Sequence, residues 1–99
     1  MTIPEYCEQL SQLLAVSNEA DKSIMFLALS NQYKSDKRET VSKLKALFTG
    51  GMGSFNDLVL YKEGKVDFPA MEKLVSLRDE LYKAVVEKII AFRRADSGY

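Results

Sequence analysis

The chain has 99 residues, with 14 basic and 14 acidic side chains, one cysteine and no histidine. A neutral chain offers no strong overall field for nucleic acid or an anionic membrane, and without histidine neither a His-based triad nor an imidazole metal site can be built. A single cysteine cannot form an internal disulfide, so we expect a reducing compartment, the cytoplasm. The length predicts one domain over residues 1–99.

The first predicted helix covers residues 2–17. Thr2 and Glu5 have the spacing of a capping box, and apolar residues recur at steps of three and four. Glu5 and Glu8 lie on the opposite, polar face. No basic residue precedes Lys22, unlike the start of a signal peptide, and the longest apolar run is far shorter than the ~20 residues that span a bilayer. We therefore expect no contact with a membrane.

The second predicted helix begins at Asn18, as its cap, and extends to about Asn31 or Tyr33. Its apolar residues are divided between two faces. One face is formed by Ala20, Ile24, Leu27 and Ala28. The other is formed by Met25, Phe26 and Leu29. A helix that is apolar nearly all round is normally covered, either by another part of the monomer or by another chain.

The third helix is predicted from Ser35 or Asp36 to Phe48, with Gly50 at its left-handed end. Basic residues gather on and just before this helix, and they are Lys34, Lys37, Arg38, Lys43 and Lys45. A nucleic-acid contact along residues 34–45 is therefore the second candidate function, although no aromatic side chains are interleaved with the basic ones.

The glycine-rich segment from Gly50 to Asp57 interrupts the helical pattern. Its glycines are Gly50, Gly51 and Gly53. They favour a tight chain reversal, and the backbone N–H groups of the segment could also form an anion-binding nest. Ser54, Phe55 and Asn56 stand where a Walker loop, a dinucleotide fingerprint or a nucleophile elbow requires other residues. The sequence thus favours a structural turn and leaves anion binding open.

The run Gly50-Gly-Met-Gly-Ser-Phe-Asn-Asp-Leu58 resembles a motif in a family of small uncharacterised bacterial proteins. The resemblance covers mainly residues 40–60. It implies that Asn56 and Asp57 belong to a structural signature of the turn. It also implies a protein without assigned catalytic activity, of the kind that often serves as a toxin-immunity partner. The chain departs from this pattern in the long helix that follows the motif.

The C-terminal part is predicted to be a long helix that begins after a possible short β-ribbon. The two strands of the ribbon would be residues 58–61 and 65–68. Asp67 caps the helix, Pro69 fits its first turn, and the apolar pattern persists to about Arg94.

Arg78 falls within the apolar arc of this long helix. Its stem can pack there while the guanidinium reaches water, or it can form a partly buried ion pair, for which Asp57 is the favoured partner.

Together these patterns predict an all-α fold: a small four-helix bundle-like domain with a Gly-rich irregular insertion before a long C-terminal helix. We expect no catalytic residues, cofactor or metal, and a role in binding another protein, either a cognate toxin-like partner or a second copy. The candidate contact residues are Met25, Phe26 and Leu29, with Glu5 and Glu8 as rim charges. Cys7, on the core stripe of the first helix, is expected to be a buried thiol.

Overall fold

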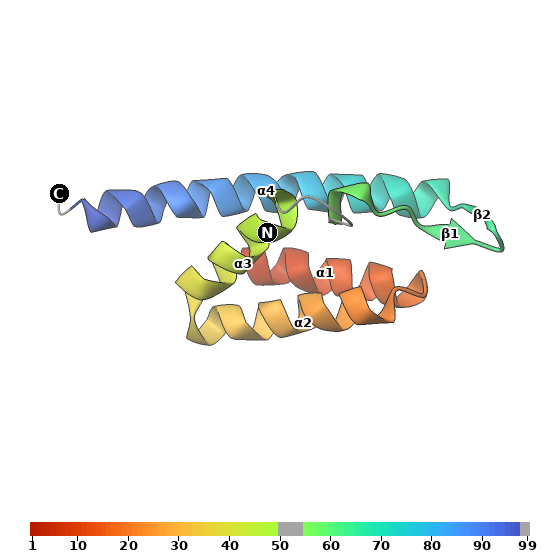
Figure 1. Ribbon diagram of the computed structural model, residues 1–99, viewed down its shortest axis with the longest axis horizontal. Helices are drawn as coiled ribbons and strands as arrows, with labels where there is room; N and C mark the ends of the chain where they lie inside the picture. The colour runs from red at the N-terminus through yellow and green to blue at the C-terminus, as the bar shows by residue number, and fades with distance from the viewer. Residues whose placement is uncertain (50–54, 98–99) are drawn as a thin grey trace.

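The computed structural model describes residues 1–49 and 55–97. Helices α1 (Ile3–Val16) and α2 (Ala20–Ser35) form an antiparallel hairpin, and α3 (Lys37–Thr49) leads from it towards the long α4 (Phe68–Asp96), which lies on the other side of the molecule (Figure 1). A 3-10 turn, η1 (Phe55–Asp57), and a ribbon of β1 (Tyr61–Lys62) and β2 (Lys65–Val66) precede α4. The predicted all-α fold, with its short ribbon before a long final helix, is confirmed.

The helix starts follow from side chains that accept backbone hydrogen bonds. Thr2 and Glu5 form the predicted capping box of α1. The Asp36 carboxylate accepts from the N–H of Glu39 at 3.1 Å, and the Asp67 carboxylate accepts from the N–H of Ala70 at 3.2 Å. These contacts satisfy donors that a helix start leaves without intrahelical partners. The predicted end of α3 at Gly50 lies outside the described residues.

The turn between α1 and α2 is a Schellman motif. Asn18 has a φ of 62°, in the left-handed region. The N–H of Glu19 donates to the carbonyl of Leu14 at 2.9 Å, and the N–H of Asn18 donates to that of Ala15 at 3.4 Å. Asn18 therefore ends α1, and its prediction as the cap of α2 is wrong: Glu19 holds that position without a side-chain hydrogen bond.

A pair of buried serines joins α1 to α2. The Ser11 hydroxyl donates to the carbonyl of Ser23 at 2.8 Å, and the Ser23 hydroxyl donates to the carbonyl of Ser11 at 2.7 Å. About two turns further along α2, the Ser30 hydroxyl donates to the carboxylate of Glu8 at 3.1 Å. Small side chains let the two helices approach closely, and these contacts fix which side of α2 faces α1.

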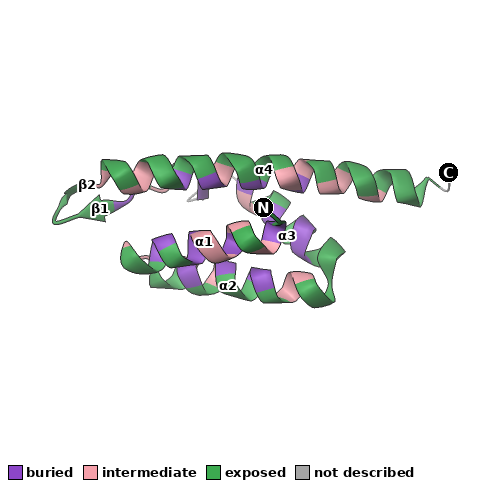
Figure 2. Cartoon of the chain, turned by 180° about the vertical axis from the view of Figure 1, so that it is seen from behind, coloured by how far each residue is buried: buried purple, intermediate pink, exposed green. Residues whose placement is uncertain are grey.

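The core is centred on aromatic rings from three elements. The ring of Phe55 in η1 lies 5.0 Å from that of Phe26 in α2 and 5.8 Å from that of Phe48 in α3, measured between centroids. The stripe that α4 contributes consists of Leu74, Leu77, Leu81 and Val85, all buried. Figure 2 shows the buried residues of the helices on the sides that face one another.

The ribbon is shorter than predicted. Tyr61 pairs with Val66 and Lys62 with Lys65, across a turn in which Glu63 and Gly64 have φ values of 54° and 78°. Positive φ at both turn residues is typical of the type I′ hairpin. Leu60 is fully buried in the core, so the chain becomes a strand only after it.

Candidate interaction surface

The face of α2 that the sequence offered as a contact surface lies in the core. Phe26 is fully buried and Leu29 is 6% exposed, while Met25 is partly buried against the same core. Phe55, near the end of the Gly-rich segment, packs directly on Phe26. The prediction that Phe26 and Leu29 contact a partner is therefore wrong, because Phe55 packs on Phe26 and Leu29 is buried in the same core.

The opposite side of α2 is exposed and apolar. Ile24 is 66% exposed and Leu27 is 48% exposed. We call this surface the α2 outer face, and it consists of Ala20, Ile24, Leu27 and Ala28, all exposed. No charged residue occurs from Ser23 to Tyr33. Within the hairpin, α2 lies farther from α4 than α1 does (Figures 1 and 2).

The hairpin that carries this surface is acidic. Glu8 of α1 accepts a hydrogen bond from Ser30, which lies on the buried side of α2. Glu5 is exposed, and hydrogen bonds from the backbone and the hydroxyl of Thr2 lower its pKa. Residues 1–33 contain four acidic side chains and one lysine, Lys22, which lies 3.5 Å from the carboxylate of Glu19. Glu5 and Glu8 contribute to this acidic charge, and their role as rim charges of a contact stays a prediction.

The turn between α3 and α4 is held by Asn56. Its side-chain amide donates to the carbonyl of Phe48 at 2.6 Å, in the last turn of α3. Its own carbonyl accepts from the guanidinium of Arg78 at 3.0 Å. Arg78 thus reaches this turn from α4, but the described contact is with Asn56. The ion pair with Asp57 stays a prediction, and Gly50, Gly51, Gly53 and Ser54 lie outside the described residues.

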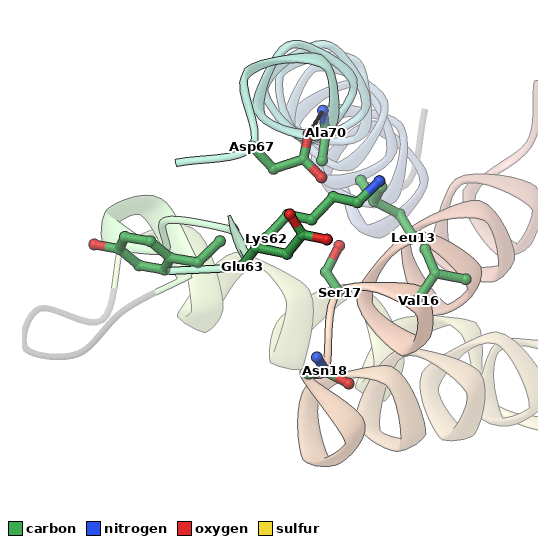
Figure 3. A pocket seen from close by; sticks show the side chains of 9 residues that line it. Leu13, Val16, Ser17, Asn18, Lys62, Glu63, Asp67 and Ala70 are labelled. Carbon is green, nitrogen blue, oxygen red and sulfur yellow. Dashed lines mark hydrogen bonds between the residues drawn. The ribbon is translucent and has the colours of Figure 1, made fainter. Parts of the chain in front are cut away.

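Two pockets lie near helix ends, one beside the end of α3 and one beside the end of α1. One, of about 230 Å³, is lined by Arg78, Asp79 and Tyr82 of α4 with Phe48, Thr49 and Asn56. The other, of about 380 Å³, lies between the end of α1 and the ribbon. In Figure 3, Lys62 and Glu63 extend from the ribbon beside Ser17, and Asp67 bonds to the backbone of Ala70. Because Asp67 serves as the cap of α4, this second pocket has one of its two carboxylates already engaged.

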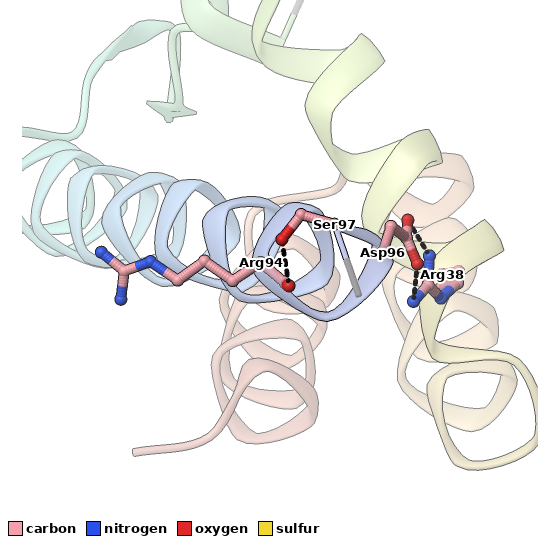
Figure 4. Close-up of polar contacts among 4 residues, drawn as sticks. All are labelled: Arg38, Arg94, Asp96 and Ser97. Carbon is pink, nitrogen blue, oxygen red and sulfur yellow. Dashed lines mark hydrogen bonds and ion pairs between the residues drawn. The ribbon is translucent and has the colours of Figure 1, made fainter. Parts of the chain in front are cut away.

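Two basic residues of α3, Arg38 and Lys43, have hydrogen-bond partners within the chain. The guanidinium of Arg38 bonds to both carboxylate oxygens of Asp96, at 2.8 and 2.9 Å (Figure 4). It also lies over the ring of Phe92. The ammonium of Lys43 lies 3.4 Å from the side-chain oxygen of Gln32. At 100° per residue, Lys37, Arg38 and Lys45 fall within an arc of about 100°, while Lys43 points away from them. The guanidinium of Arg38 within this arc is engaged by Asp96, and a nucleic-acid contact along residues 34–45 stays a prediction.

Cys7 is fully buried, as predicted. Burial raises the pKa of its thiol to about 12, and the nearby charge of Glu8 acts in the same direction. A thiol in this state is not a nucleophile near neutral pH.

Within residues 1–49 and 55–97, no three histidine, cysteine or acidic side chains come together as metal ligands. In the same residues no helix is both long and apolar enough to cross a membrane.

The fold and this surface define a small all-α protein whose helical hairpin presents an uncharged apolar face. The chain belongs to the family described as a domain of unknown function (DUF6966), whose model matches residues 8–67. No curated protein and no solved structure matches the chain. The matched residues include the whole α2 outer face and end at Asp67, the cap of α4.

The sequence separated the two faces of α2 correctly but assigned them the wrong way round. Two signals pointed to the right assignment. Phe26 is the largest side chain of the helix without a polar atom and gains most from burial. Ser23 and Ser30 mark the side that approaches another helix closely, and both lie nearer to Phe26 than to Ile24 around the helix.

Proposed function

We propose that this protein acts by binding another protein through the α2 outer face. The observation that carries the proposal is the exposure of Ile24 and Leu27 within a stretch of eleven uncharged residues, 23–33. Water-exposed apolar side chains that lie together on one face are typical of protein–protein contacts, while single scattered ones are not. The serine hydrogen bonds between α1 and α2 fix the orientation of α2, and the α2 outer face is left exposed.

The charge around the surface indicates the chemistry of the partner. The α1–α2 hairpin is acidic, and Lys22 is already paired with Glu19. A partner with an apolar ridge bordered by lysine or arginine would be complementary to it. A nuclease toxin, which must be basic to bind nucleic acid, has this chemistry. An immunity or antitoxin-like role is the finer form of the proposal, and the resemblance around residues 50–58 supports it.

A capture experiment with matched variants tests the proposal. The tagged chain, its Ile24→Lys variant and its Ile90→Lys variant are each expressed in the native host, and captured proteins are quantified by mass spectrometry. Ile90 is also an exposed helical isoleucine, but it lies on α4. We expect a stoichiometric basic companion with the wild type and Ile90→Lys, and its loss with Ile24→Lys. With the purified pair, affinity for Ile24→Lys should fall at least ~10-fold.

Two outcomes would contradict the proposal. A companion retained equally by Ile24→Lys would place binding elsewhere on the chain. A wild type that binds no protein but binds duplex DNA or RNA, with an affinity that falls steeply with salt, would favour the nucleic-acid function along residues 34–45.

A further inference from the structure

The long helix α4 presents a second apolar surface, separate from the α2 outer face. Val75, Tyr82 and Ile90 are 37%, 44% and 42% exposed, and Val86 is partly buried between them. At 100° per residue these four residues fall within an arc of about 80°, to one side of the buried stripe of α4, and the exposed Asp79 lies in the same arc. We call the four apolar residues the α4 flank. Among the described residues, Phe48 of α3 packs on one edge of the flank, with its ring 5.2 Å from that of Tyr82 between centroids, and the outer sides of Val75, Tyr82 and Ile90 remain exposed.

We propose that the α4 flank binds the α4 flank of a second copy of this chain, with the two helices antiparallel. A two-fold axis between Tyr82 and Lys83 places Val75 of each copy opposite Ile90 of the other. A two-fold contact of this kind is self-complementary, because the same surface is used twice. This proposal does not rest on the α2 outer face, since α2 and α4 lie on opposite sides of the molecule (Figure 1).

The charged residues beside the α4 flank favour an antiparallel pair of helices over a parallel pair. Glu72 and Arg93 are exposed and border the α4 flank at its two ends. They are equidistant from the proposed axis, so each Glu72 faces Arg93 of the other copy. Asp79 comes within one turn of Lys83 of the other copy. A parallel pair would instead bring Glu72 against Glu72 and Arg93 against Arg93, and flanking charges of this kind set the orientation of paired helices.

A charge-swap experiment tests the proposal. Within one chain, Glu72 and Arg93 are about 32 Å apart along the helix, so any coupling between them must act between copies. We expect the wild type to show a concentration-dependent dimer in sedimentation equilibrium. Glu72→Arg and Arg93→Glu should each raise the dimer dissociation constant about tenfold at low salt, since the two-fold axis counts each contact twice. The double variant should restore the wild-type value.

The controls separate this proposal from the proposed function. Ile24→Lys should leave the dissociation constant unchanged, whatever it does to partner capture. A chain that stays monomeric at all concentrations would overturn the proposal. A dimer whose stability does not respond to either charge variant, or is not rescued by the double variant, would also overturn it.

Discussion

At the scale of single residues, burial determines what the one cysteine can do. Cys7 is surrounded by the core, and desolvation raises the pKa of its thiol from the ordinary 9.0 to about 12. In the unfolded chain the thiol would ionise near 9.0. Its contribution to stability is therefore full below that pH and is lost as the pH rises towards about 12.

We accordingly expect Cys7 to be unreactive in the native protein. A thiol reagent such as dithionitrobenzoate should label it stoichiometrically in denaturant, but only at the rate of unfolding in native buffer. The midpoint of urea unfolding should fall as the buffer is taken from neutral pH to above 9.0. Rapid labelling of the folded chain at neutral pH would show that the thiol is accessible, against this account.

The two faces of α2 should differ sharply in their energetic roles. Phe26→Ala removes a ring at the centre of the core and should lower the free energy of unfolding by ~3–5 kcal/mol. Ile24→Ala, on the α2 outer face, should change it by less than ~0.5 kcal/mol. Denaturant unfolding of both variants checks the pair of values. Similar losses for the two would mean that Ile24 is packed as well.

The sequence predicts that α2 has two apolar faces, but it does not predict which of the two is covered. Helical spacing divides the apolar residues of α2 into two faces, because that division depends only on positions within the helix. Which face is covered depends on Phe55, which lies in the Gly-rich segment, nearly thirty residues along the chain from Phe26. Spacing within one helix carries no information about such a contact, and the assignment of Phe26 and Leu29 failed for this reason.

At the scale of elements, local signals predict helix boundaries well. Thr2, Asp36 and Asp67 each accept backbone hydrogen bonds where a helix begins, as their positions in the sequence indicated. Asn18 is the exception. Asn serves both as a helix cap and as a left-handed residue after a helix, and the sequence alone does not say which role wins.

Asn56 should stabilise the junction between α3 and α4. Replacing it with alanine leaves the carbonyl of Phe48 without this donor, and we expect a loss of about 0.5–1 kcal/mol in the free energy of unfolding. Asn31→Ala, at an exposed position of α2, is the matched control and should have a smaller effect. An Asn56→Ala variant as stable as the wild type would show that the hydrogen bond contributes nothing.

At the scale of the whole molecule, the structure separates two apolar surfaces. The α2 outer face lies within residues matched by the family model, while the α4 flank lies beyond them. The arrangement allows one surface to bind a partner while the other joins two copies. A dimer would then present two α2 outer faces, which would raise the apparent affinity for any partner that is itself multivalent.

Photo-crosslinking in the native host identifies what contacts the α2 outer face and what contacts the α4 flank. Benzoylphenylalanine is placed at position 24 in one variant and at position 90 in another, and the adducts are identified by mass spectrometry. We expect an adduct with a different, basic protein from position 24 and an adduct with a second copy of the chain from position 90. Position 24 giving no adduct, or giving the same product as position 90, would contradict it.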